Sequence, residues 1–328
     1  MRAYLVKAFG HQELVDLPVP TPAADDVLVR VRATSINPYD WHIFLGEPRI
    51  ARVMPGGVGV RRPDLKTLGC DVAGTVEAVG RDVTAFRPGD EVYALVREGG
   101  FAEYVTVRQD LLTFKPKTIG YEESAAVPMA AITAMVALRD VGRLEAGQKV
   151  LVNGASGGVG SFAVQIAKAY GAKVAGVCGP RNVEMVRSIG ADEVFDYRAE
   201  DFTRSSQRYD LMLDIAGGRP IGACRKVLED KGTLVAVGGP AGRWFQPVGQ
   251  VVSTMIRGPF VSQRMAMASV VAGTPKQQHL TTLADLIDAG QIRPVIGRRY
   301  GFEEIPAALA YQQQGHSGGK VVVTVHPA

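Results

Sequence analysis

One stretch constrains the fold more than any other: residues 149–170, which read KVLVNGASGGVGSFAVQIAKAY. An apolar run, Val150 to Val152, leads into a glycine cluster, which predicts a buried parallel strand that ends in a tight loop. Beyond the loop, apolar residues recur at helical spacing from Val159 to Ala167, so we expect a helix that packs one face on the sheet. This order of strand, glycine loop and helix is typical of a dinucleotide-binding unit.

The loop is expected to hold the phosphates of a dinucleotide. Phosphate binds well where bare backbone N–H groups and the positive end of a helix dipole point at it. The spacing is G-x-x-G-x-x-G, in which Gly160 lets the helix lie tightly on the strand. The alternative interpretation is a tight strand-to-helix turn without a ligand. The predicted contacts are Ser156, which stands in the place of the middle glycine of the common fingerprint, and Gly157, Gly158 and Val159.

The bulk properties bound the class of protein. A length of 328 residues favours two domains, and a net charge of +4 spread along the chain does not form a nucleic-acid footprint. No apolar run approaches the roughly 20 residues of a membrane span, and the first ten residues lack a signal-peptide pattern. Three scattered cysteines, Cys70, Cys178 and Cys224, fit a reducing compartment without disulfides. We therefore expect a cytoplasmic protein with no nucleic-acid or membrane partner.

The pattern of the chain changes near residue 122. Before it, short alternating strands separated by turns predict a small, partly open β-barrel. After it, strands and helices alternate, with strands expected at 149–154, 173–178, 193–197, 210–215 and 232–238 and a sixth near Phe260 to Ser262. Such alternation implies a doubly wound parallel sheet. The fold class is therefore α/β: a barrel domain plus a dinucleotide-binding domain.

The end of the chain is expected to return to the barrel. Helices are predicted at 276–289 and 304–314, followed by a final strand over 320–325. The predicted domains are therefore residues 1–122 with 270–328, and residues 123–269. Pro128 is expected to interrupt a helix over 122–138. The glycine-, proline- and arginine-rich stretch 51–66 is interpreted as a plain insertion or, as the alternative, a lid.

The end of the second strand of the parallel sheet favours NADPH over NADH. An acidic residue there bonds the ribose of NAD, whereas an arginine accepts the 2′-phosphate of NADP. Here the sequence reads VCGPRN, with no acid and with Arg181 placed to clamp a phosphate. Tyr197, at the end of the third strand, is expected to pack against the adenosine.

Several segments together resemble the medium-chain dehydrogenase/reductase superfamily, in particular its zinc-independent NADPH:quinone oxidoreductase branch, which includes the zeta-crystallin-like proteins. They are Asn37-Pro38-Tyr39-Asp40, the segment LGCDVAG over 68–74, Arg87-Pro88-Gly89-Asp90, GGFAEY over 99–104 and the glycine loop, in that order. The resemblance covers nearly the whole chain. It implies a GroES-like barrel plus a Rossmann domain, and a homodimer formed through the last strand of the Rossmann sheet.

The resemblance also bears on metal. Zinc alcohol dehydrogenases have a cysteine ligand where this chain has Asn37, and a His-Glu pair where it has Cys70-Asp71. The segment that holds the third ligand corresponds to residues 125–133, which contain no cysteine, histidine or acid. An asparagine is a poor ligand for zinc, and Cys70 is interpreted as a small buried residue. No metal is expected.

Without a Lewis acid, the acceptor must disperse the incoming charge itself, as quinones and activated enones do. Asn37 and Tyr39 are expected to line the acceptor pocket and to bond the nicotinamide or the acceptor oxygen, with Tyr39 as the best side-chain proton donor unless solvent supplies the proton. Asp40 and His42 are interpreted as structural. By resemblance, the remaining coenzyme contacts are Thr133, Gly238, Gly239, Phe260 and Ser262 near the nicotinamide, and Lys320 on the adenosine side.

The leading hypothesis is thus an NADPH-dependent quinone or enone reductase. An enoyl-thioester reductase of the same fold is a second hypothesis, which a preference for acyl-CoA substrates would favour. A third is a non-catalytic NADPH-binding protein, either crystallin-like or sensory, which predicts tight coenzyme binding without turnover.

Overall fold

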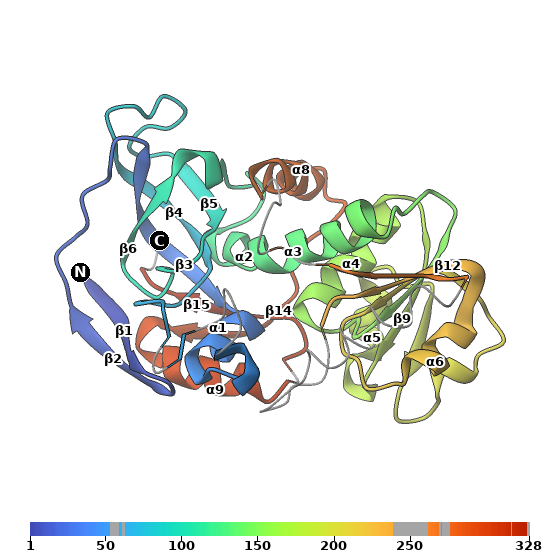
Figure 1. The fold of residues 1–328 in the computed structure, drawn as a ribbon. Helices are drawn as coiled ribbons and strands as arrows, with labels where there is room; N and C mark the ends of the chain where they lie inside the picture. Colours follow the sequence, from blue (N-terminus) through green and yellow to red (C-terminus); the bar gives the residue numbers. More distant parts are fainter. Residues whose placement is uncertain are drawn as a thin grey trace. The chain divides into compact units, whose positions relative to one another are not determined.

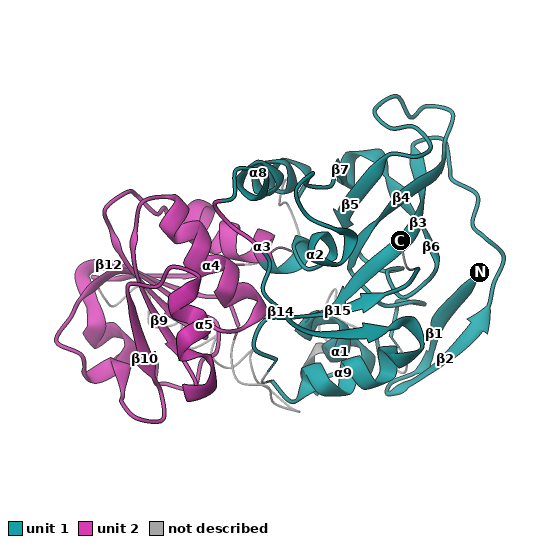
Figure 2. Ribbon diagram, turned by 180° about the vertical axis from the view of Figure 1, so that it is seen from behind, with its two compact units in different colours: residues 1–130, 275–290, 294–328 teal, residues 131–274, 291–293 magenta. Residues whose placement is uncertain are grey.

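The computed structural model describes residues 1–52, 59–60, 63–238, 262–268, 270, 276–315 and 317–326. The chain forms two compact units, coloured separately in Figure 2. Unit 1 contains Met1–Ala130, Pro275–Gly290 and Pro294–Ala328. Unit 2 contains Ala131–Thr274 and Gln291–Arg293.

Unit 2 is built on a six-stranded parallel sheet in the order β10-β9-β8-β11-β12-β13, of which β9 and β12 are labelled in Figure 1. The strand order reverses between β8 and β11, and dinucleotides bind at such a switch point, beyond the carboxyl ends of the strands. The predicted doubly wound α/β fold is confirmed. The strands are β8 (Lys149–Asn153), β9 (Lys173–Cys178), β10 (Glu193–Asp196), β11 (Tyr209–Asp214), β12 (Leu228–Ala236) and β13 (Arg264–Met267).

Burial explains why these segments form a central sheet with helices beside it. Val150, Leu151 and Val152 of β8 are fully buried, as expected for a strand covered on both faces. In the helix that follows, every residue from Gly160 to Ala167 is buried, so more than the one predicted face is covered. The helical segments after the strands are α4 (Gly158–Ala169), η4 (Pro180–Asn182), α5 (Val183–Ser188), η5 (Phe202–Arg204), α6 (Ile221–Cys224) and η6 (Arg225–Val227).

The sixth strand lies further along the chain than predicted. It runs over Arg264–Met267 and pairs in parallel with β12, with Arg264 opposite Thr233 and Met267 opposite Ala236. Ser262 therefore precedes this strand and lies at the amino edge of the sheet, the edge opposite to the glycine loop. The prediction that Ser262 follows the sixth strand and flanks the nicotinamide is wrong, because pairing with β12 begins only at Arg264.

Unit 1 is dominated by a mostly antiparallel sheet in the order β14-β15-β3-β4-β5-β7, with β6 paired to β3; all of these strands except β7 are labelled in Figure 1. Val27, Val29 and Val31 of β3 are fully buried, while Arg30 between them and Arg32 after them are partly exposed, as the alternation predicts. A separate hairpin contains β1 (Arg2–Ala8) and β2 (His11–Asp16). The sheet strands are β3 (Asp26–Ile36), β4 (Asp71–Val79), β5 (Glu91–Leu95), β6 (Tyr104–Arg108), β7 (Leu112–Phe114), β14 (Ile296–Gly301) and β15 (Lys320–Thr324).

The two last strands come from the end of the chain. β15 lies between β14, its parallel neighbour, and β3, its antiparallel neighbour, so the predicted return of the tail to the first domain is confirmed. The helical segments of this unit are α1 (Pro38–Leu45), η1 (Arg49–Arg52), η2 (Gln109–Leu111), α2 (Tyr121–Ala125), α8 (Lys276–Asp288), η8 (Phe302–Glu304) and α9 (Ile305–Gln313).

The division between the units falls inside α3 (Pro128–Met135), which continues as a π-helical turn, η3 (Val136–Val141). Pro128 separates α3 from α2, as predicted. The boundary lies eight residues beyond the predicted residue 122, because α2 packs on β3, β4 and β15 and so belongs to unit 1. Residues 291–293 belong to unit 2, where Gln165 of α4 bonds to the backbone N–H and carbonyl of Arg293.

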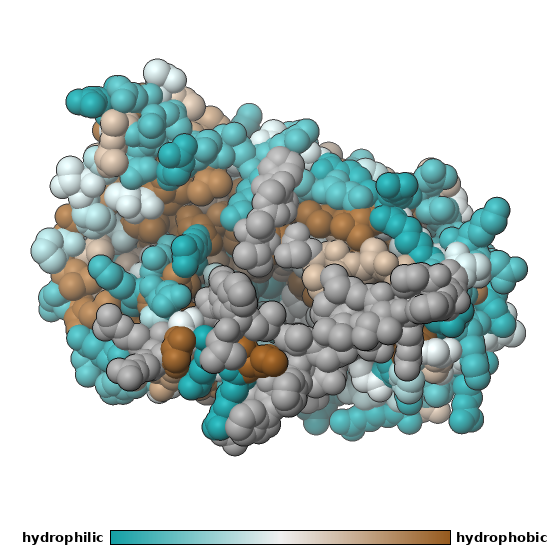
Figure 3. All heavy atoms as spheres, in the orientation of Figure 1, coloured by the Kyte–Doolittle hydropathy of each residue, from teal (hydrophilic) through white to brown (hydrophobic). Residues whose placement is uncertain are grey.

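The outer surface is mixed in polarity. In the face shown in Figure 3, hydrophilic residues follow the outline and hydrophobic residues gather in smaller patches between them. Within the described ranges, no helix is long and apolar enough to cross a bilayer. The large hydrophobic side chains exposed there are Leu14, Val19, Val60, Phe114, Tyr197 and Met267.

Candidate active site

The glycine loop of unit 2 fits the phosphates of a dinucleotide. Gly154 adopts a φ of +93°, a conformation that side chains disfavour, and it turns the chain from β8 toward α4. Gly157 is the N-cap of α4, and no side chain caps the helix, so the first-turn N–H groups are left for a ligand. Ser156, Gly158 and Val159 are each half-buried around this N-terminus. These four predicted contacts therefore lie together at the carboxyl end of β8.

The end of β9 holds the predicted adenosine-side contacts. Arg181 is exposed in η4, and within the described residues its guanidinium has no hydrogen-bond or ion-pair partner. Tyr197, which is 43% exposed, extends its ring over Gly179: a Cβ on that glycine would lie 3.2 Å from the tyrosine oxygen. A flat aromatic ring, a bare backbone and a guanidinium with no partner among the described residues thus lie at two adjacent strand ends, and they fit an adenosine that carries a 2′-phosphate.

Three other predicted coenzyme contacts fall in the described part of unit 2. Thr133 is half-buried on α3, and Gly238 follows β12, where a Cβ would lie 2.7 Å from the carbonyl oxygen of Ile215. Gly238 is thus at the carboxyl edge of the sheet, whereas Ser262 is at the other edge. Gly239 and Phe260 lie outside the described residues.

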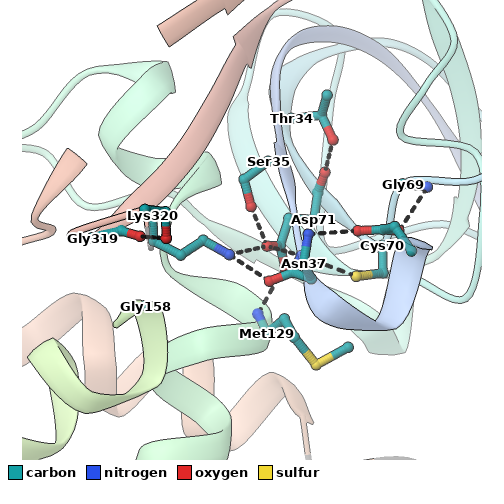
Figure 4. Close-up of polar contacts among 12 residues, drawn as sticks. Thr34, Ser35, Asn37, Gly69, Cys70, Asp71, Met129, Gly158, Gly319 and Lys320 are labelled. Atoms are coloured by element: carbon teal, nitrogen blue, oxygen red, sulfur yellow. Dashed lines mark hydrogen bonds and ion pairs between the residues drawn. The ribbon is translucent and has the colours of Figure 1, made fainter. Parts of the chain in front are cut away.

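Unit 1 contains a buried polar cluster that connects three distant parts of the chain (Figure 4). Asn37 follows β3 as the N-cap of α1, Asp71 begins β4, and Lys320 begins β15. The Lys320 ammonium lies 2.5 Å from Asn37 Oδ1 and 3.2 Å from Asp71 Oδ2. Asn37 Nδ2 donates to Asp71 Oδ2 at 2.8 Å. We call these three residues the Lys320 cluster.

Asp71 is the centre of the Lys320 cluster. Its side chain is fully buried, and a buried carboxylate must be paired and hydrogen-bonded to remain charged. Besides Asn37 and Lys320, the hydroxyl of Ser35 donates to Oδ2 and the backbone N–H of Met129 donates to Oδ1. Sequence reasoning missed the roles of Ser35 and Met129, because no local pattern marks a donor to a carboxylate so far along the chain.

The side-chain amide of Asn37 forms three hydrogen bonds within the protein. Its two N–H groups donate to Asp71 and, at 3.3 Å, to Cys70 Sγ, while its oxygen accepts from Lys320. Asn37 therefore has no hydrogen left to donate to an acceptor oxygen; only the second lone pair of Oδ1 is available, to accept a hydrogen bond. Asn37 can therefore bond the nicotinamide only as a hydrogen-bond acceptor, which is a narrower role than the one predicted. The expectation that Lys320 faces the adenosine is corrected too, because its side chain is 3% exposed and bonded to Asn37 and Asp71.

Tyr39 keeps its hydroxyl available. The side chain is partly buried at the start of α1, and within the described residues its oxygen has no hydrogen-bond partner. Burial, with Cys70 and Asp40 nearby, raises the pKa of Tyr39 to about 12. The phenol is therefore protonated at neutral pH and can donate a hydrogen bond.

Asp40 has a structural role at the start of α1, as predicted. Its carboxylate is fully buried and accepts from the backbone N–H of Asn37 at 2.8 Å and from that of Gly69 at 3.1 Å. These bonds fix the backbone that carries Asn37 and Tyr39. His42, two residues further along, bonds the carbonyl of Glu47, which fits its predicted structural role.

Burial raises the pKa of Asp40 to about 7, and this predicts a pH-dependent stability. Between about pH 4 and pH 7 the folded protein holds a proton that the unfolded chain has lost. The stabilising contribution is therefore full below pH 4 and is lost as the pH rises through 7. We expect the difference in unfolding free energy between the natural protein and Asp40→Asn to fall with rising pH, by up to about 1.4 kcal/mol per pH unit. Urea titrations from pH 4.5 to 8.5 measure it, and a difference that rises with pH would contradict the assignment.

The donors around the Lys320 cluster suit an ammonium better than a metal ion. The carboxylate of Asp71 is already paired with Lys320, and the oxygen of Asn37 faces the same cation. Burial raises the pKa of the Cys70 thiol well above its usual range, which disfavours the thiolate that zinc requires. In the described part of the chain, no group of three or more histidine, cysteine and acidic side chains is placed to hold a metal.

Comparison with known proteins gives two family matches and relatives of similar length. The alcohol dehydrogenase GroES-like domain matches residues 23–117, and a zinc-binding dehydrogenase domain matches residues 189–323. The chloroplast envelope quinone oxidoreductase homolog of Arabidopsis thaliana is 34% identical over 326 residues, which cover 95% of this chain and 93% of that protein. The mitochondrial NAD(P)H oxidoreductase RTN4IP1 of Mus musculus is 33% identical, covering 99% and 89%. Among solved structures, the CurK enoyl reductase matches with a TM-score of 0.84 at 26% identity, covering 98% of each chain.

Proposed function

Because the chain belongs to the zinc-independent quinone oxidoreductase branch of the medium-chain dehydrogenase/reductase superfamily, we propose that it transfers a hydride from NADPH to a quinone or an activated α,β-unsaturated carbonyl. The chain is a nicotinamide-dependent oxidoreductase. The choice of NADPH and the class of acceptor are the parts that we propose.

The Lys320 cluster is the observation that carries the proposed acceptor class. It presents an ammonium, an amide and a paired carboxylate, which do not form a Lewis-acid site for a developing alkoxide. A quinone or an enone needs no such site, because conjugation spreads the incoming charge onto its own oxygen. The protein then contributes mainly by holding the acceptor in the right orientation relative to the coenzyme.

Residues of this chain can be assigned to coenzyme binding, to orientation of the nicotinamide and to hydrogen-bond donation to the acceptor. When bound, the reduced coenzyme supplies the hydride. The N-terminus of α4 would hold its diphosphate, and Arg181 would bind the 2′-phosphate. The second lone pair of Asn37 Oδ1 would accept from an amide N–H of the nicotinamide, and Tyr39 would donate to the acceptor oxygen. The positions of Arg181 and Tyr197 at adjacent strand ends support NADPH over NADH.

Replacing Tyr39 with phenylalanine is expected to lower kcat/KM for enones about 10- to 100-fold, because the enone loses the hydroxyl group that donates a hydrogen bond and a proton to it. Quinones are expected to lose less, since water can protonate a hydroquinone. Steady-state kinetics with one acceptor of each kind measure the difference. Tyr4→Phe is the matched control: the Tyr4 hydroxyl bonds the Glu303 carbonyl at 2.9 Å, away from α1, and its loss should leave both rates unchanged. Equal losses for Tyr39→Phe with both acceptors would rule out the donor role.

A steady-state screen of NADPH oxidation against quinones, alkenals and enoyl thioesters tests the proposed function. Turnover of quinones or alkenals supports it. The likeness to the CurK enoyl reductase favours one second candidate, reduction of an enoyl thioester, which a clear preference for acyl thioesters would select. Tight NADPH binding without turnover of any acceptor would instead indicate a non-catalytic binding protein.

A homodimer is also part of the proposal. β13 is the last strand of its sheet and pairs only with β12 in the described part of the chain, so one row of backbone groups is open to a second copy. Met267 at its end is 42% exposed. Gel filtration with light scattering tests this; a monomer at micromolar concentration would exclude it.

We keep the cytoplasm as the proposed compartment. Cys70, Cys178 and Cys224 are all buried and free, as suits a reducing environment. Microscopy of the tagged protein in its own cell tests the assignment, and enrichment in an oxidising compartment would contradict it.

A further inference from the structure

Lys320 reaches the acceptor site through strand register. Val321 of β15 lies opposite Ile36 of β3, so the next position on each strand brings Lys320 beside Asn37. Just before it, Gly318 and Gly319 both have positive φ, and a Cβ on Gly319 would lie 2.6 Å from the carbonyl oxygen of Val295. The turn therefore needs glycine in order to bring the lysine into this place.

The ammonium and the carboxylate of Asp71 neutralise each other inside the protein. Their side chains are 3% and 0% exposed, and charges so buried are kept only when they are paired. Two of the three ammonium hydrogens bond to acceptors in the described part of the chain, Asn37 Oδ1 and Asp71 Oδ2. Removal of the lysine alone would leave a buried carboxylate without its counter-charge.

The same two charges determine which way the Asn37 amide points. An ammonium only donates hydrogen bonds, so the atom that faces Lys320 must be the amide oxygen. A carboxylate only accepts, so the atom that faces Asp71 must be the amide nitrogen. A flipped amide would break both bonds at once, and the amide therefore has a single orientation.

We propose that Lys320 is a positioning residue for hydride transfer: its buried ammonium locks the orientation of the Asn37 amide and leaves one lone pair of Oδ1 for a second hydrogen bond. This inference rests on the proposed function, since it gives Asn37 its use as a fixed acceptor for the nicotinamide amide. Lys320 acts through Asn37 and does not itself touch the coenzyme.

Two variants separate positioning from stability. Lys320→Met removes the charge at similar length, and it should destabilise the fold because Asp71 loses its partner. The double variant Lys320→Met with Asp71→Asn restores neutrality and should regain most of that stability. Lys115→Met is the matched control: Lys115 is also buried, 8% exposed, and paired at 3.2 Å with Glu91, but it lies outside the Lys320 cluster.

The measurements are the single-turnover rate of NADPH oxidation, the dissociation constant of NADPH by fluorescence, and the hydrogen exchange of the Asn37 side-chain amide by NMR. We expect the double variant to lose about 10- to 100-fold in rate while the dissociation constant changes less than twofold, because a misplaced ring slows the transfer but leaves the phosphates bound. Amide exchange should quicken at least tenfold. Lys115→Met should change none of the three. If Lys320→Met does not fold, the double variant carries the test.

Two results would overturn the proposal. A double variant that regains the full rate along with its stability would make Lys320 merely structural. A dissociation constant that rises tenfold with an unchanged rate would make it a coenzyme contact. If the natural protein reduces no acceptor, the proposed function fails, and the exchange of the Asn37 amide still decides whether Lys320 locks it: unchanged exchange would overturn the inference.

Discussion

Alanine in place of Gly160 is expected to lower the free energy of unfolding by about 3 kcal/mol and to weaken coenzyme binding at least tenfold. A Cβ at this position would lie 2.0 Å from the Gly154 carbonyl oxygen and 2.8 Å from Ala155 Cα. Both are backbone atoms that cannot rotate away, so α4 must move off the end of β8. The N–H groups at its first turn then no longer converge on the phosphates. Urea unfolding and NADPH fluorescence titration measure the two effects.

Gly157→Ala is the matched control in the same loop. Among the described residues, a Cβ there would meet only the Gly154 carbonyl oxygen at 3.5 Å, an ordinary contact, and its φ of −79° suits alanine. We expect the unfolding free energy to change by less than about 0.5 kcal/mol. Coenzyme affinity should still fall about tenfold, because the methyl group occupies the space of a phosphate oxygen. If Gly157→Ala binds NADPH as the natural protein does, the loop is only a tight turn.

Removal of the Arg181 side chain is expected to have the second large effect, a change in selectivity between NADPH and NADH. We expect Arg181→Ala to raise the KM for NADPH on the order of 10- to 100-fold, because a charge-assisted bond to the 2′-phosphate contributes about 1.5–3 kcal/mol. The KM for NADH should change less than twofold, since NADH lacks that phosphate. Steady-state kinetics with both coenzymes and one acceptor measure the selectivity.

Arg187→Ala is the control for general surface charge. Arg187 is an exposed arginine of the neighbouring helix α5, and its guanidinium pairs with Glu184 at 2.8 Å. Its loss should leave the ratio of the two KM values unchanged. Equal rises for NADPH and NADH in Arg181→Ala would end the assignment of Arg181 to the 2′-phosphate, and with it the preference for NADPH.

The sequence was most informative where the physical signal is local. In unit 2, the apolar run of β8, the glycines and the helical spacing after them fall within about twenty residues, so the strand, the glycine loop and the helix could be predicted at their observed positions. Pro128 similarly marks the break before α3, since proline removes a backbone donor. Each of these signals acts without reference to the rest of the chain.

Prediction failed where the controlling contact is distant. Lys320 and Asn37 are 283 positions apart, and nothing near either residue shows that one ammonium orients the other's amide. Asn37 was expected to bond the nicotinamide or the acceptor oxygen, but no local signal showed that Asp71 and Cys70 take both of its hydrogens and leave it only as an acceptor. Ser262 was misplaced for a related reason: the start of β13 is set by its pairing with β12 and not by its own residues.

The order in which the strands are made has a consequence for biogenesis. β3 is synthesised before unit 2, but its partner β15 is synthesised only after unit 2. Until then, Ala33 to Ile36 lack β15 as a neighbouring strand, and Asp71 lacks its counter-ion Lys320. Unit 1 therefore stays incomplete while unit 2 is translated. A nascent chain arrested before residue 296 should therefore expose a protease-sensitive amino-terminal half beside an already resistant coenzyme-binding half.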